Sequence, residues 1–213
     1  MSFDAEEITY QADEPLANTI TRMLPTLPAT VIGSWSFPGW YAKFCADVKQ
    51  HPEAFGSDDR EEALRDAIRL AIDDQLRAGA DIITDGEMQR VDFNLGFYDY
   101  LEGLKPLAPA RRWGAPAHDQ RSRYVCVAPI EAPRGLGLVE EYRRLRQYTA
   151  APIKMPVPGP FTLAGCIQVG DVYRERHSVT EALLPMVNQE MKHLVDAGVD
   201  FIQLDEPSFA CHP

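Results

Sequence analysis

Two stretches of the chain share one pattern: residues 78–87 read AGADIITDGE, and residues 197–207 read AGVDFIQLDEP. Each follows apolar residues at helical spacing, turns at a glycine, runs through a short apolar segment and stops on carboxylates. A helix, a tight turn and a buried parallel strand form the repeating unit of α/β barrels, whose chemistry lies at the carboxyl ends of the strands. The repeat therefore predicts an α/β fold of the (β/α)8 TIM-barrel type.

The periodicity along the rest of the chain predicts five strands alternating with helices, the strands at residues 29–33, 81–84, 123–130, 153–157 and 201–204. An eight-stranded α/β barrel usually takes about 250 residues, whereas this chain has 213. We therefore expect an incomplete barrel, with about five of its eight βα units, at residues 26–213. Residues 1–25 are polar and are expected to form an N-terminal extension.

The composition restricts the kinds of partner that the protein binds. Acidic residues outnumber basic ones by 32 to 21, which gives a net charge of −11. Nucleic acids and anionic membranes require a basic face, so the charge argues against both. We see no charged leader followed by an apolar stretch, and no apolar run near about 18 residues. The four cysteines lie far apart without a CxxC pair. Reduced thiols and a cytoplasmic location are expected.

Two acids follow the repeated strands and are candidate site residues. Glu87 comes after Gly86, whose backbone freedom would let the acid point over the barrel mouth. Asp205 ends the second repeat, where Pro207 turns the chain away and holds the carboxylate at the strand end. A carboxylate at that place suits an ammonium group or acid/base chemistry. The alternatives are a solvated turn acid for Glu87 and a helix or turn cap for Asp205, and Asp85 is expected to close an Asx turn.

The first predicted strand ends in Ile32, Gly33 and Ser34. Backbone amides and a hydroxyl beside a glycine can hold a ligand carboxylate, although a plain turn fits the same residues. The chain contains no P-loop, no GxGxxG and no Ser-His-Asp spacing. Cys211 and His212 are adjacent, which is a poor arrangement for one tetrahedral metal ion, so no metal ligand is expected within the chain.

Four motifs in order carry a family resemblance: LPATVIGS at residues 27–34, DGE at 85–87 with Arg90, PGPFT at 158–162 and QLDEP at 203–207. Together they resemble the catalytic barrel of cobalamin-independent methionine synthases and their shorter single-barrel relatives. This family transfers a methyl group to the thiol of homocysteine and so makes methionine, with a zinc ion holding the thiol. The resemblance implies a cytoplasmic methyltransferase of the 5-methyltetrahydropteroyltriglutamate–homocysteine type.

The resemblance also assigns roles by position. Ile32, Gly33 and Ser34 would receive the homocysteine carboxylate, and Glu87 and Asp205 would hold its ammonium group. The zinc ligands of the family, a His-x-Cys pair followed by Glu and Cys, would lie C-terminal to Pro213. We therefore expect no catalytic residue within this chain and a fragment that is inactive alone.

The sequence departs from the long enzymes at two positions that contact the methyl donor. Cys166 stands where they carry a folate-contacting Trp, and Cys211 stands where they carry a folate-contacting Glu. The donor is therefore left open between a folate and a corrinoid. Two other functions remain as alternatives: a relative that alkylates another thiol, such as coenzyme M, and a non-catalytic half-barrel. The open strand edges of a half-barrel would bind a partner chain or a second copy.

Overall fold

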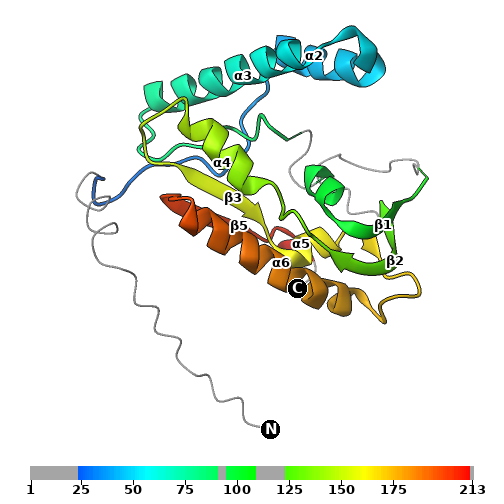
Figure 1. Ribbon diagram of the computed structural model, residues 1–213. Helices are drawn as coiled ribbons and strands as arrows, with labels where there is room; N and C mark the ends of the chain where they lie inside the picture. The colour runs from blue at the N-terminus through cyan, green and yellow to red at the C-terminus, as the bar shows by residue number, and fades with distance from the viewer. Residues whose placement is uncertain (1–23, 91–94, 109–122, 212–213) are drawn as a thin grey trace.

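The computed structural model describes residues 24–90, 95–108 and 123–211 (Figure 1), so the predicted extension lies almost wholly outside the described residues. No helix in these ranges is both long and apolar enough to cross a bilayer. The elements in chain order are α2 (Gly39–Gln50), η1 (Pro52–Ala54), α3 (Ser57–Arg77), η2 (Leu95–Tyr100), β1 (Glu102–Pro106), β2 (Tyr124–Glu131), α4 (Leu138–Arg146), β3 (Lys154–Pro158), α5 (Pro160–Ala164), β4 (Ile167–Gln168), α6 (Arg176–Asp196), β5 (Phe201–Asp205) and α7 (Ser208–Cys211).

Four chain segments lie side by side in parallel. Thr30 forms a parallel bridge with Ile82, and Ile83 forms another with Ile153, at the entry to β3. β3 then pairs with β5 in parallel along its whole length. The α/β architecture is therefore present, with the carboxyl ends of the four segments at one edge, as a barrel wall requires. The described residues do not close into a barrel.

The predicted third strand forms, but it does not belong to this wall. β2 pairs antiparallel with β1 and parallel with the short β4, in a separate three-stranded sheet. Because Ile83 pairs directly with Ile153, no place remains for β2 between them. The expectation of five alternating barrel strands is therefore wrong: the described residues contribute four.

The two repeats end their helices in the same way. Gly79 after α3 and Gly198 after α6 have φ values of 85° and 88°, which only glycine adopts readily. The amide of each glycine bonds the carbonyl three residues back, at 3.1 and 2.9 Å. The amide of the next residue bonds the carbonyl five residues back, at 3.0 and 3.1 Å. Both glycines therefore close Schellman motifs that aim the chain into the following strand.

The aspartate that begins each repeated strand also has one structural role. Asp81 Oδ2 accepts the backbone N–H of Ala29 at 2.7 Å. Asp200 Oδ2 accepts the backbone N–H of Ile153 at 2.8 Å and also an N–H of Arg146 at 2.6 Å. Each carboxylate thus ties the start of its strand to the start of the neighbouring parallel segment.

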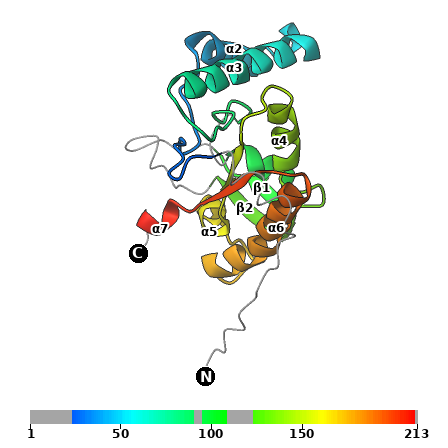
Figure 2. The ribbon, with the colours of Figure 1, turned by 90° about the vertical axis from the view of Figure 1, so that its left-hand side faces the viewer.

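The helices lie around the parallel segments. Figures 1 and 2 show α2 and α3 along one side of the molecule and α6 along the opposite side, with β3, β5 and α4 between them. α3 and α6 turn their apolar faces inward, and α4 adds Leu138, Tyr142 and Leu145 to the same core. β3 is buried along its whole length, as a strand between other strands and helices should be.

Candidate functional site

Glu87 reaches the strand ends through an unusual backbone. Gly86 has a φ of 71° and Glu87 has a φ of 59°, the only positive value among the described residues that are not glycine. A Cβ atom at Gly86 would lie 2.7 Å from the Trp35 Cβ, so no larger residue fits this turn. Left-handed backbone is unfavourable by about 1–2 kcal/mol for an ordinary residue and concentrates at functional sites. The turn directs the Glu87 carboxylate inward, where its side chain is 6% exposed.

Thr84 and Asp85, at the end of the second parallel segment, fix the Gly86–Glu87 turn through hydrogen bonds. The Thr84 hydroxyl donates to the Gly33 carbonyl at 3.0 Å and accepts the Gly86 amide at 3.0 Å. Asp85 Oδ1 accepts the Glu87 amide at 2.9 Å, which closes the predicted Asx turn. Asp85 therefore shapes the turn from a buried position.

The first and second segment ends meet at Glu87. The Ser34 hydroxyl donates a hydrogen bond to Glu87 Oε2. A Cβ atom at Gly33 would lie 2.9 Å from Glu87 Oε1, so glycine leaves the space that the carboxylate fills. Within the described residues, the amides of Gly33 and Ser34 donate to no acceptor. Ile32, by contrast, points outward, with its side chain 82% exposed. What this corner offers an anion is therefore main-chain N–H groups, since the Ser34 proton is already engaged.

Asp205 ends β5 beside a small polar network. Gln203 Nε2 donates to Asp205 Oδ1 at 2.7 Å, and Lys154 Nζ donates to Gln203 Oε1 at 2.7 Å. Lys154 also donates to the Val31 carbonyl, so the network joins the first segment to β3 and β5. Burial raises the pKa of the Asp205 carboxyl, while the Gln203 bond and the Lys154 and Arg90 charges oppose that rise. Burial in turn lowers the pKa of Lys154.

The acids act on one another electrostatically. Burial raises the pKa of Glu87, and the negative charges of Asp85 and Asp205 raise it further. The Ser34 hydrogen bond and the Arg90 charge act in the opposite direction. The negative charge of Asp205 therefore disfavours the ionised form of Glu87. A cation placed between them would relieve that repulsion.

The neighbouring Glu206 has a role that sequence reasoning missed. Its carboxylate accepts the amides of Phe161 and Thr162 at 2.9 and 2.8 Å, and the Thr162 hydroxyl at 2.6 Å. It therefore caps α5 from β5, and Gly159 leaves room for it, since a Cβ there would lie 2.1 Å from its Cδ. The motifs PGPFT and DEP contain the two sides of this contact. Because Phe161 and Glu206 lie 45 residues apart, local sequence patterns do not predict that they meet.

A second residue that the sequence did not single out beyond its motif is Arg90. Its guanidinium is buried and contacts Glu87, Glu141 and the Pro156 carbonyl. Arg90 thus joins the Glu87 turn to α4 and β3. Its fixed fork of donors suits this role of holding several acceptors at once.

The described residues offer no metal site. Within residues 24–90, 95–108 and 123–211, no group of three or more His, Cys, Asp or Glu side chains is arranged to hold a metal ion. Cys166, one of the two positions that depart from the long enzymes, is buried. The side chain of Cys211 lies outside the described part of the structure.

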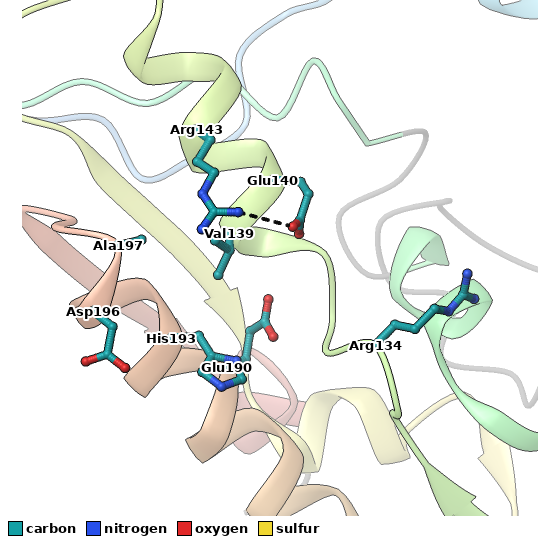
Figure 3. Close-up of a pocket in the computed structure, with 8 residues that line it drawn as sticks. All are labelled: Arg134, Val139, Glu140, Arg143, Glu190, His193, Asp196 and Ala197. Atoms are coloured by element: carbon teal, nitrogen blue, oxygen red, sulfur yellow. Dashed lines mark ion pairs between the residues drawn. The ribbon is translucent and has the colours of Figure 1, made fainter.

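A pocket of about 290 Å³ lies between α4 and α6 (Figure 3). Its charges are mixed, and Arg143 and Glu140 at its rim pair at 3.7 Å. Glu190 on its floor already accepts the amides of Leu136 and Leu138 at 2.9 and 2.8 Å, which anchors the start of α4. The lining residues are Arg134, Val139, Glu140, Arg143, Glu190, His193, Asp196 and Ala197.

Comparison with known proteins places the chain in a family. A family model described as the catalytic domain of cobalamin-independent synthase matches residues 27–212. The methionine synthase of Saccharolobus solfataricus is 33% identical over 187 residues, which cover 87% of this chain and 54% of that protein. The methionine synthase of Sulfurisphaera tokodaii is 34% identical, with 89% and 54% covered. The chain thus spans about half the length of the curated relatives it matches.

A solved structure shares the fold. The B12-independent methionine synthase of Shewanella sp. W3-18-1, in complex with selenomethionine, superimposes with a TM-score of 0.68 at 31% identity. The match covers 87% of this chain and 53% of that one.

Proposed function

Because this chain belongs to the family of the cobalamin-independent synthase catalytic domain, we propose that it serves a methyltransferase that makes methionine from homocysteine. Its part in that reaction is recognition of the amino-acid end of the acceptor. One observation carries the proposal: Ser34 and Glu87, from two different strand ends, share a hydrogen bond, and the charge of Asp205 at a third strand end raises the pKa of Glu87. The relatives named methionine synthase and the selenomethionine in the Shewanella structure support an amino-acid ligand.

The chemistry of the cluster fits a zwitterion. The ammonium group would lie between the Glu87 and Asp205 carboxylates, relieve their repulsion and form charge-assisted hydrogen bonds. The carboxylate would accept the amides of Gly33 and Ser34, which have no acceptor among the described residues. Ile32 would contribute backbone only, because its side chain points outward. Held at both ends, the amino acid has only its side chain free, and the thiol lies at the tip of that side chain.

The family's chemistry implies zinc to hold the acceptor thiol and a folate or corrinoid as methyl donor. The described residues do not fit a zinc site. The roles proposed for this chain are therefore confined to binding and orienting the amino acid, and no transfer step is assigned to its residues.

The acid pair also distinguishes between acceptors. Coenzyme M carries a sulfonate and no ammonium group, so Glu87 and Asp205 would repel it rather than bind it. Homocysteine presents the cation that this pair requires. The cluster therefore favours an amino acid over the alternative thiol.

The parallel segments fit the wall of a (β/α)8 barrel. We propose that their free edges pair with further strands, which the relatives carry in the half of their length that this chain does not match. Among the described residues, β5 pairs only with β3, and the segment of Thr30 pairs only with that of Ile82. A barrel removes such edges by pairing them. A non-catalytic half-barrel that binds a partner chain uses the same edges.

Calorimetric titration of the chain with L-homocysteine tests the proposal. Glu87→Gln and Asp205→Asn each remove a charge-assisted bond of about 1.5–3 kcal/mol, so each should weaken binding roughly 10- to 100-fold. Glu53→Gln, an exposed acid on η1, is the matched control and should bind as the wild type does. Coenzyme M should not bind. Unchanged affinity in both site variants, or equal binding of coenzyme M, would contradict the assignment.

A further inference from the structure

Arg90 divides its donors unequally between two carboxylates. Its side chain is 2% exposed, so each donor needs a protein acceptor. Nη2 donates to Glu141 Oε2 at 2.7 Å, and Nε donates to the same oxygen at 3.0 Å. Nη1 reaches Glu87 Oε1 only at 3.4 Å. Glu141 therefore holds the guanidinium more closely than Glu87 does.

Glu141 is itself firmly placed. It lies near the start of α4, where its amide bonds the Gly137 carbonyl at 3.2 Å. Gln89 Nε2 donates to its carbonyl at 3.1 Å and to Asp85 Oδ2 at 3.0 Å, which ties α4 to the Glu87 turn. The Phe97 ring faces the Arg90 guanidinium, with its centroid 4.9 Å from the Arg90 Cζ. The position of Arg90 is thus set from α4, β3 and η2 rather than by Glu87.

This arrangement decides how much negative charge remains at Glu87. The charged groups that act on Glu87 or on its partner Arg90 are Asp85, Arg90, Glu141 and Asp205, and the charge of Lys154 lowers the pKa of Asp205. Without Glu141, the buried Arg90 guanidinium would turn its fork to Glu87 and form the bidentate pair that arginine prefers. A ligand ammonium would then have to displace that pair.

We propose that Glu141, which lies in none of the family motifs, is a positioning residue: it holds Arg90 away and so leaves the Glu87 carboxylate to an ammonium group. This inference rests on the proposed function. The directions of the pKa shifts agree with it: burial raises the pKa of Glu141, Arg90 opposes the rise, and the charges of Asp85 and Glu87 add to it.

The first test needs no ligand. The carboxyl carbon of Glu87 is followed by NMR against pH in the wild type, Glu141→Gln, Glu141→Asp and Glu140→Gln. Removing the Glu141 charge should lower the Glu87 pKa, because a repulsive charge is lost and Arg90 moves closer. Glu141→Asp keeps the charge at a shorter reach and should give a smaller fall. Glu140→Gln, which changes the adjacent exposed acid that pairs with Arg143, should change nothing.

The direction of the change separates positioning from mere structure. If Glu141 only anchored Arg90, losing it would loosen the cation and raise the Glu87 pKa. An unchanged or raised value in Glu141→Gln overturns the inference. Should that variant not fold, Glu141→Asp decides alone, since a Glu87 pKa equal to that of the wild type overturns it equally.

The second test measures homocysteine affinity at neutral pH. Glu141→Gln should bind homocysteine about tenfold more weakly, because the ammonium group must first displace Arg90 from Glu87. Glu140→Gln should match the wild type. A lowered Glu87 pKa with unchanged affinity overturns the link to ligand binding. Failure of the wild type to bind homocysteine contradicts the proposed function, whereas the NMR titration still decides whether Glu141 controls Arg90.

Discussion

At the scale of single residues, the ionised Asp205 carboxylate lowers the stability of the folded protein at neutral pH. The pKa of Asp205 is raised above its ordinary value of 3.8, mainly by burial. A raised carboxyl pKa means that the folded state prefers the protonated form. Its contribution to stability is therefore present below the ordinary value and is lost as the pH rises through the raised value.

Asp205→Asn removes this charge and is expected to stabilise the protein at neutral pH. The melting temperature of the variant should exceed that of the wild type at pH 7, and the difference should vanish as the pH falls to the ordinary value of 3.8. Thermal melts across the pH range measure this. Glu181→Gln, an exposed acid on α6, serves as the control. A difference that persists at low pH would mean that the gain has another cause.

Ligand affinity should follow the same acids. An ammonium group lowers the pKa of Glu87 and Asp205, so homocysteine binding should release protons near their raised pKa values. Affinity should therefore fall as the pH drops through that region. Titration calorimetry in buffers of different ionisation enthalpy measures the proton count. Constant affinity down to the ordinary values of 4.5 and 3.8 would argue against ionised acids as the ligand's partners.

At the scale of elements, α5 depends on a cap from another strand. Glu206→Ala would leave the amides of Phe161 and Thr162 and the Thr162 hydroxyl without their acceptor. We expect a loss of about 1–2 kcal/mol in the free energy of unfolding, as for a removed helix cap. Urea denaturation measures it, with Glu181→Ala as the exposed control. A loss no larger than that of the control would show that water replaces the cap.

The repeated aspartates should differ in strength although they share a role. Asp200→Asn breaks an ion pair with Arg146 as well as a bond to the Ile153 amide, and the Asp200 side chain is 14% exposed. Asp81→Asn weakens one bond at an exposed position. We expect about 1.5–3 kcal/mol for Asp200 and less for Asp81. Equal losses, measured by urea denaturation, would mean that the Arg146 pair contributes nothing.

At the scale of the whole molecule, the open strand edges should favour association. Leu204 on β5, Phe209 on α7 and Ile32 in the first parallel segment are exposed apolar residues. Light scattering after size exclusion should detect species larger than a monomer as the concentration rises. Leu204→Lys with Phe209→Lys should shift the chain toward a monomer, whereas Leu184→Lys on α6 should not. A wild type that stays monomeric at every concentration would contradict association through the open strand edges.

Much of the fold follows from local pattern. The four parallel segments, the helices α3, α4 and α6, and the glycines that end two of those helices all have local signals, because periodicity and turn chemistry act within a few residues. β2 was recognised as a strand but assigned to the wrong sheet. Alternation along a strand does not indicate which strand it pairs with. Because Ile83 pairs directly with Ile153, β2 cannot lie between their segments.

The candidate site divides in the same way. Motif and strand end predict Ser34, Glu87 and Asp205 as site residues; in the structure Ser34 bonds Glu87, and the Asp205 charge raises the pKa of Glu87. Their role in binding a ligand stays a prediction. The sequence does not predict the roles of Glu141 and Glu206, because their partners lie 51 and 45 residues away. Nothing in the neighbouring residues distinguishes these two acids from an exposed surface acid.

By itself, the sequence determined that strands end in acids and that glycines turn the chain toward them, since those are properties of neighbouring residues. Only the tertiary structure decided which acids remain available. Burial sets their charge through the loss of water, and Arg90 is shared among carboxylates from separate elements, so the electrostatics of the site exist only once those elements have packed together.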